Sequence, residues 1–310
     1  VMVKLYSGIV LLSGIMWGVI GIFVRELRKF GFTSVQISAL RWIFSAIVVL
    51  AAVLLHDRKK MKIKLNDIWM FAFMGICSLL AMSTFYFMCM ERTSVAVSDV
   101  FLYTSPIWVM ILSAIFLKEK ITAEKIISIM FVFIGCTLVS GVFGQDNGGF
   151  SVTGVLFGVL SGLAYSLYGV VGKNILKKYD RATLTVYNFI FAAVGALFII
   201  NVPQTAKMIA TDVASLKAII LLAVIGTVIP FFMYTTSLKY LSPSRVAVLS
   251  CIEPVSATVT SIFVIGERMS LLQFAGIVFI ISTIAYMQIA SGEKSGNSIN
   301  AETKFGRLVK

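Results

Sequence analysis

Residues 105–120, SPIWVMILSAIFLKEK, and residues 253–268, EPVSATVTSIFVIGER, decide the fold because the second stretch repeats the first after 148 residues. This shift superimposes Pro106, Ser113 and Glu119 on Pro254, Ser261 and Glu267. It also superimposes Tyr86, Ser94 and Val100 on Tyr234, Ser242 and Val248, and Ser13, Gly14, Trp17 and Gly21 on Ser161, Gly162, Tyr165 and Gly169. A shift of 147 places residues 42–44 over 189–191, so one small insertion or deletion separates the two alignments. A register held over so much of the chain indicates an internal duplication.

Each copy contains five apolar runs of membrane-spanning length, because a helix needs about 20 apolar residues to cross the hydrocarbon core. The runs lie at 5–24, 36–55, 68–90, 94–117, 126–143, 152–172, 183–201, 215–237, 243–264 and 271–289. Of the 310 residues, 59% are hydrophobic and 13% charged, against about 45–50% and about a quarter in soluble domains. We therefore expect an all-α integral membrane protein with ten transmembrane helices.

An odd number of spans in each copy has a topological consequence. The second copy must enter the membrane from the side opposite to the first, which makes the copies two inverted five-helix repeats. Inverted repeats support alternating access, with the substrate near the midplane between them. We expect repeats over 1–145 and 149–290, followed by a flexible polar cytoplasmic tail over 291–310.

The distribution of positive charge predicts the orientation. With the N-terminus inside, the inner segments hold 19 Lys and Arg residues and the outer loops hold 7, while Arg41 lies within a span. Cytoplasmic loops of membrane proteins carry this excess. The net charge of +13 is thus explained by membrane orientation and not by nucleic-acid binding. We expect a multi-pass protein of the inner (plasma) membrane with both termini cytoplasmic.

The sequence contains no motif for metal binding, ATP hydrolysis or enzymatic catalysis. The four cysteines stand singly inside apolar runs, and His56 is the only histidine, so we expect no metal site and no cofactor. No Gly-x-x-x-x-Gly-Lys-Ser/Thr loop occurs, so the chain is not its own ATPase. No Gly-x-Ser-x-Gly turn and no paired catalytic aspartates occur either, and we expect no enzymatic activity.

Three ionisable residues lie inside the predicted spans: Arg41, Asp99 and Glu253. Each costs about 2.5–3.5 kcal/mol at a helix centre on insertion scales, so each needs a partner or a wet cavity. Arg41 and Asp99 lie at similar depth below the outer surface. They form an ion pair that joins two helices, or Asp99 binds a cationic or zwitterionic substrate or forms part of an outer gate.

Glu253 lies near the middle of the ninth span, and no cation is expected at its depth. A protonatable acid there suits proton coupling or substrate binding. The structural alternative is a neutral side chain hydrogen-bonded to a carbonyl that Pro254 leaves free. The 148-residue shift places Asp99 on Ala247 and Glu253 on Ser105, so the two acids do not occupy equivalent faces.

Aromatic residues and prolines form a second set of candidates. Trp17 and Tyr165 are repeat equivalents that suit the wall of a substrate cavity. Tyr103 lies one turn beyond Asp99, where the two could hold an ammonium group. Tyr86 and Tyr234 are equivalents placed toward opposite sides, as matched gates would be, although packing or interfacial anchoring is the alternative. Pro106 and Pro254 are candidate hinges.

The chain resembles the EamA-type members of the drug/metabolite transporter superfamily over about residues 5–290. The matching features are Trp17-Gly18, Arg41, Ser105-Pro106 with Lys118-Glu119-Lys120, and Glu253-Pro254 with Gly266-Glu267-Arg268. Asp99 departs from the family pattern. The resemblance implies a transporter, and together with the repeat it predicts a secondary active transporter of small polar metabolites in the lipid bilayer.

Isolated acids and aromatic residues favour amino acids or amines as substrates, with proton-coupled export or exchange. A lipid-handling flippase with the same fold is the alternative function. The sequence leaves the oligomeric state open, a homodimer included.

Overall fold

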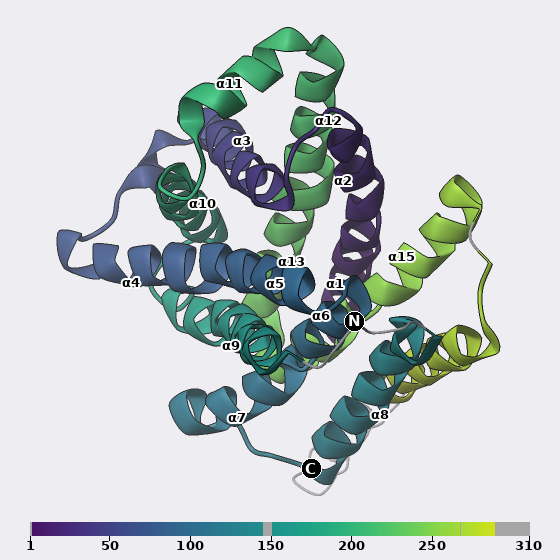
Figure 1. The fold of residues 1–310 in the computed structure, drawn as a ribbon. Helices are drawn as coiled ribbons and strands as arrows, with labels where there is room; N and C mark the ends of the chain where they lie inside the picture. Colours follow the sequence, from purple (N-terminus) through teal and green to yellow (C-terminus); the bar gives the residue numbers. More distant parts are fainter. Residues whose placement is uncertain (1, 145–150, 267, 289–310) are drawn as a thin grey trace, which may run out of the picture.

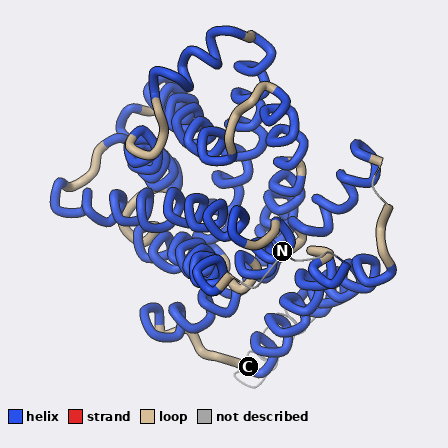
Figure 2. Tube along the Cα trace, in the orientation of Figure 1, coloured by secondary structure: helices blue, strands red, loops and turns tan. Residues whose placement is uncertain are grey.

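The computed structural model describes residues 2–144, 151–266 and 268–288, and all regular structure in these ranges is helical (Figure 2). The first half contains α1 (Met2–Gly18), α2 (Ile20–Lys29), α3 (Ser34–His56), η1 (Arg58–Met61), η2 (Leu65–Asp67), α4 (Ile68–Phe73), η3 (Met74–Leu80), α5 (Ala81–Arg92), α6 (Val95–Leu102), α7 (Ser105–Leu117), α8 (Ala123–Val139) and η4 (Val142–Gly144). The second half contains α9 (Val152–Ile175), α10 (Arg181–Leu197), α11 (Val202–Thr211), α12 (Val213–Ala223), η5 (Val224–Val228), α13 (Ile229–Tyr240), α14 (Pro243–Ser250), α15 (Glu253–Thr260), η6 (Ser261–Ile265) and the helix Leu271–Gln288. Glu267 and the predicted tail 291–310 lie outside the described residues.

Eight helical segments in the described part of the chain are long and apolar enough to cross a membrane. They are Met2–Lys29, Ser34–His56, Leu65–Arg92, Val95–Leu117, Val152–Ile175, Val213–Tyr240, Pro243–Val264 and Leu271–Gln288. A bent pair, α10 and α11, brings the number to nine if it counts as one span. The chain is therefore a multi-pass helical membrane protein. The remaining predicted run, 126–143, corresponds to α8, which has 17 residues and is about 25 Å long.

The segment that the sequence analysis missed is α11. The predicted run 183–201 ends early, at Leu197, and the chain then bends by 104° into α11. Local chemistry explains this start: the Asn201 side chain accepts a hydrogen bond from the Gln204 backbone N–H, and a proline lies in the first turn. Gln36 of α3 donates to Thr205 across 3.1 Å and so fixes α11 over the bundle.

Helix interruptions recur at equivalent places in the two halves. Two residues, Tyr103 and Thr104, separate α6 from α7, and residues 251–252 separate α14 from α15. In each case a proline lies in the first turn of the following helix, where it has no N–H to donate backwards. The π-helical turns η3 and η5 overlap under the same 148-residue shift, and so do the left-handed residues Lys118 (φ 55°) and Gly266 (φ 78°). The prolines thus mark real breaks in both helices.

Glycines on α1 and α9 pack against these two breaks. A Cβ on Gly14 would lie 2.9 Å from the Ser250 carbonyl oxygen, and one on Gly162 would lie 2.6 Å from the Phe101 carbonyl oxygen. Such close approach needs small residues at helix interfaces. Farther from this contact, α8 and the helix Leu271–Gln288 lie side by side (Figure 1), with a Cβ on Gly135 lying 3.0 Å from the backbone oxygen of the other helix.

An aromatic core joins α3, α9, α10 and α13. Trp42, Tyr168, Phe189 and Phe231 are almost fully buried, and their ring centroids are 5.2–5.7 Å apart in the contacting pairs. Edge-to-face and tilted pairs at this spacing add to the stabilisation from burial alone. This core supports one side of the candidate site, because Trp17 packs on Phe231 with a centroid distance of 5.0 Å.

The close contact of α1 with α15 predicts a specific sensitivity. A Cβ at Gly18 would lie 2.6 Å from the backbone nitrogen of Ala257, so Gly18→Ala is expected to lower the free energy of unfolding by about 1–3 kcal/mol through overpacking. Gly8→Ala is the control, since nothing lies within 4 Å of a Cβ there. Unfolding titrations in mixed detergent measure the effect, and equal stability of the two variants would contradict this packing.

Candidate substrate site

Glu253 is the first residue of α15, directly after the break in the chain. Its side chain is half-buried, and α1 passes close behind, because a Cβ on Gly14 would lie 3.5 Å from the Glu253 backbone nitrogen. A carboxylate in the first turn of a helix is favoured by the unpaired N–H groups and the helix dipole. The break therefore places an acid at a helix start inside the bundle, beside α1.

Electrostatic partners surround the Glu253 carboxyl. It interacts with the carboxylate of Asp99 and with the guanidinium of Arg41. The tyrosine hydroxyls of Tyr103 and Tyr165 also lie within its electrostatic range. The Arg41 guanidinium on α3 thus acts electrostatically on Glu253 on α15, which residue counting along separate helices does not show. These electrostatic interactions link five of the six candidate substrate or coupling residues, which are together called the cluster around Glu253.

Asp99 and Arg41 do not form the ion pair that was one alternative from the sequence. The Tyr86 hydroxyl donates to Asp99 Oδ1 across 2.7 Å, and Arg41 Nε donates to Thr227 Oγ1 across 2.8 Å. The guanidinium carbon also lies 4.9 Å from the centroid of the Trp42 ring. Each charge is held by a neutral hydroxyl, which leaves its remaining polar atoms for a ligand.

Trp17 is the aromatic centre of the site. Its ring contacts Tyr165 at a centroid distance of 6.5 Å and Tyr234 at 5.6 Å, so the two predicted wall residues do meet. The buried indole Nε1 has no hydrogen-bond acceptor among the described residues. Tyr103 is buried one turn beyond Asp99, and its backbone N–H donates to the Asp99 carbonyl across 2.9 Å.

Two polar contacts of the site had no signal in the sequence. Thr227, the partner of Arg41, lies 186 residues away along the chain, within the π-helical turn η5. The hydroxyls of Tyr168 and Thr235 hydrogen-bond across 2.8 Å, and the Tyr168 ring packs on that of Tyr234 at a centroid distance of 5.8 Å. An inspection of ionisable residues does not reveal hydroxyl partners, because serine and threonine are common in membrane helices for packing reasons as well.

At one end of the bundle, one contact joins the two halves and others brace the helices within each half. Ser244 on α14 donates to Glu119 Oε2, just after α7, across 3.1 Å, and Lys125 pairs with Glu119 Oε1 at 2.7 Å. On α9, the Lys173 ammonium donates to the carbonyls of Leu238 and Leu241 across 2.7 and 2.8 Å. Helices α7 and α14 pack against each other. The 148-residue shift relates this pair to α15 and α6, which have at most marginal contact.

The comparison with known protein families agrees with this arrangement. A model of the EamA-like transporter family matches residues 5–141 and, a second time, residues 152–288. The chain belongs to the EamA-like transporter family. The two matches start at residues 5 and 152 and end at residues 141 and 288, so they are 147 residues apart at both ends. The chain is accordingly a membrane transporter.

Similar proteins support the family and the fold. An uncharacterized transporter of Archaeoglobus fulgidus is 26% identical over 89% of this chain and 93% of its own length. The uncharacterized inner membrane transporter YicL of Salmonella typhimurium is 20% identical over 92% of this chain and 96% of its own. One crystal structure aligns with a TM-score of 0.77 at 16% identity, covering 94% of this EamA-like chain and 98% of the other, a similarity of fold alone.

The hydrogen bond from Tyr86 to Asp99 predicts a stability difference. Tyr86→Phe removes the donor and leaves a half-buried carboxyl without it, so we expect a loss of about 1.5–3 kcal/mol, the usual contribution of a hydrogen bond to a charged group. The control is Tyr286→Phe, because that ring is 48% exposed and should tolerate the change. Both free energies of unfolding are measured in the same mixed micelles, and an unaffected Tyr86→Phe would refute the contact.

Proposed function

We propose that this EamA-like protein is a secondary active transporter of small polar metabolites that works by alternating access. The observation that carries the proposal is the cluster at the helix breaks: Glu253 and Asp99, one cation, Arg41, and aromatic side chains around them. Discontinuous membrane helices with charged residues near the bundle centre are typical of substrate and coupling-ion sites in transporters.

The charges of the cluster favour amines and amino acids. Two carboxyls face a single guanidinium, so an ammonium group adds the missing positive charge. Tyr103 and Trp17 supply ring faces, which attract such a cation. For an amino acid, Arg41 is the partner for the substrate carboxylate, since a guanidinium binds carboxylates in a bidentate fashion. A sugar phosphate would need more clustered cations than one arginine.

Ten spans in two inverted repeats are part of the same proposal, with α8 as the fifth span and α10 as the seventh. Support comes from the two family matches 147 residues apart and from the breaks, π-helical turns and left-handed residues that recur after 148 residues. The glycine contacts recur as well. Gly14 faces Ser250 and Ile252, while Gly162 faces their equivalents Leu102 and Thr104.

Alternating access is supported by the unequal packing at the two ends. The end near Glu119 is closed by the contact of α7 with α14. The pair α15 and α6, which would close the other end by symmetry, has at most marginal contact. There, Asp99 and Tyr86 remain half-buried. If the contact of α7 with α14 opened and α15 closed onto α6, Glu253 and Asp99 would become accessible from the opposite side.

We also propose that the protein lies in the plasma membrane with the Glu119 end and both termini in the cytoplasm. The excess of Lys and Arg in the segments at that end supports this orientation. The relative from Salmonella typhimurium is an inner membrane transporter by its printed name.

Cysteine labelling tests the orientation. In a Cys77→Ser background, which removes the exposed native thiol, a membrane-impermeant maleimide added to whole cells should label Lys207→Cys on α11 and leave Lys64→Cys unlabelled. Permeabilised cells should label both, which controls for thiol reactivity. The opposite pattern in whole cells would reverse the proposed topology.

Counterflow in proteoliposomes tests the function. We expect saturable exchange of a labelled amine or amino acid from a panel that also contains sugar phosphates. With Glu253→Gln, uptake driven by a pH gradient should fall at least about tenfold while counterflow persists, because the variant cannot carry the proton. Glu91→Gln is the matched control, since Glu91 is exposed outside the cluster.

The same vesicles distinguish the alternative function. If no solute of the panel exchanges while a fluorescent phospholipid crosses the bilayer, the flippase replaces the small-solute carrier. If the solute exchanges but Glu253→Gln retains full proton dependence, the carrier stands and the coupling role of Glu253 is refuted.

A further inference from the structure

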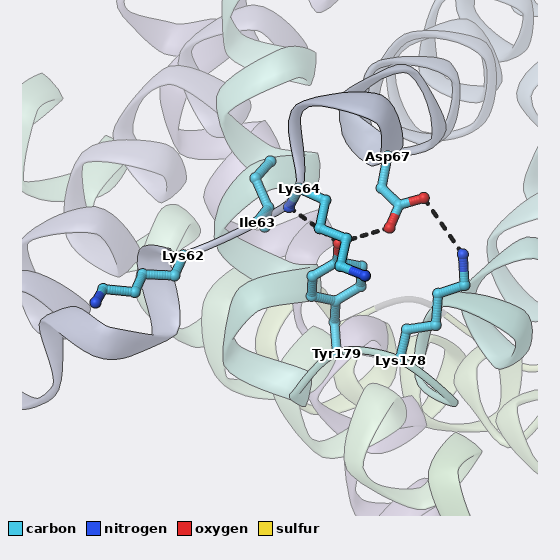
Figure 3. A pocket seen from close by; sticks show the side chains of 6 residues that line it. All are labelled: Lys62, Ile63, Lys64, Asp67, Lys178 and Tyr179. Atoms are coloured by element: carbon cyan, nitrogen blue, oxygen red, sulfur yellow. Dashed lines mark hydrogen bonds and ion pairs between the residues drawn. The ribbon is translucent and has the colours of Figure 1, made fainter.

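A second polar site lies at the bundle end that the Glu119 contact closes. It is a pocket of about 740 Å³ between the loop that joins α3 to α4 and the turn that joins α9 to α10 (Figure 3). The lining residues are Lys62, Ile63, Lys64, Asp67, Lys178 and Tyr179. None of these residues belongs to the cluster around Glu253.

The frame of the pocket is fixed by hydrogen bonds around Tyr179. Its hydroxyl donates to Asp67 Oδ2 across 2.7 Å and accepts from the Lys64 backbone N–H across 3.1 Å. The hydrogen bond to Asp67 raises the pKa of Tyr179, so the hydroxyl keeps its proton at neutral pH. Farther along the loop, Tyr187 donates to the Met61 carbonyl across 2.7 Å. The loop is therefore held against α10 in a defined shape.

The two segments that form the pocket carry more positive than negative charge. Residues 57–67 and 173–181 hold nine Lys and Arg residues and three Asp residues. Asp67 forms an ion pair with Lys178 at 3.3 Å and accepts a hydrogen bond from the Tyr179 hydroxyl. Neither Lys62 nor Lys64 has an ion-pair partner among the described residues, and Figure 3 shows the Lys62 side chain extending away from Asp67. Both lysines thus add positive charge that no ion pair in the described part of the chain neutralises, and Figure 3 shows the Lys64 side chain beside Tyr179 while that of Lys62 extends to the other side.

Exposed apolar side chains adjoin these lysines. Leu65 is 80% exposed and Trp69 is 63% exposed, directly after the basic loop. Tryptophan at the end of a membrane helix marks the level of the lipid headgroups. A ligand that reaches both Lys64 and Leu65 therefore combines an anionic head with an apolar body.

We propose that this pocket binds the phosphate headgroup of an anionic phospholipid of the surrounding leaflet. Lys64 contacts the phosphate, and Lys62 adds positive charge on the other side of the loop. The frame of Asp67 and Tyr179 holds the loop in place, and the acyl chains run past Leu65 and Trp69. A soluble phosphate would use the lysines alone, and the exposed apolar side chains favour the lipid as the source of the anion.

Lipid binding to the full-length protein tests the proposal. The protein in neutral detergent is titrated with dioleoyl phosphatidylglycerol, with dioleoyl phosphatidylcholine, and with inorganic phosphate at equal concentrations, and bound lipid is counted by native mass spectrometry. Phosphatidylglycerol should bind saturably. Each lysine near an anionic headgroup is worth about a fivefold change in affinity, so Lys62→Gln with Lys64→Gln should weaken binding roughly 25-fold.

The control is Lys207→Gln with Lys217→Gln, which removes the same charge from exposed residues of α11 and α12 and should leave the affinity within about twofold. Equal weakening by both double variants would overturn the site, because nonspecific attraction would then explain binding. Competition by inorganic phosphate at the concentration of the lipid would overturn the lipid as ligand. Equal binding of phosphatidylcholine would overturn the anionic headgroup.

Discussion

The structure depends on one constraint: every backbone N–H and C=O group inside the membrane must find a hydrogen-bond partner within the protein. A helix can break in hydrocarbon only where other protein covers the freed polar groups. Here the breaks after Leu102 and Ser250 are covered by α9 and α1, whose glycines approach the open turns closely. The break that follows Ser250 is also what turns Glu253 into a helix-starting residue. The contact of α1 with the break after Ser250 therefore covers the freed backbone polar groups and also places the acid.

Two hydroxyl contacts then organise the charges without neutralising them. Tyr86 holds Asp99, and Thr227 holds Arg41. A direct pair between Asp99 and Arg41 would have been the lower-cost arrangement for two buried charges, but it would have consumed both. With separate neutral partners, both Asp99 and Arg41 still act electrostatically on Glu253. Preorganised charges of this kind bind a ligand with less rearrangement on arrival.

The sequence predicted the architecture better than the site. The candidate hinges Pro106 and Pro254 lie in the first turn after a helix interruption in each half, where proline is tolerated because its missing N–H would have no partner there. Their role as hinges stays a prediction. The repeat register identified Trp17 and Tyr165 as equivalents, and the structure adds that their rings are in contact. The partner of Arg41 and the proximity of Arg41 to Glu253 could not be predicted, since they depend on how distant helices rotate and cross. The bend into α11 was missed because capping by Asn201 is a local signal within an apolar run.

The position of Trp17 has an optical consequence. Of the four tryptophans, Trp17 is buried against Tyr165 and Tyr234, Trp42 is sealed in the aromatic core, and Trp69 is largely exposed. Indole emission depends on the polarity and the quenchers around the ring. A chain that keeps Trp17 and carries phenylalanine at the other three positions would report changes around Trp17 by its own fluorescence, with no attached dye.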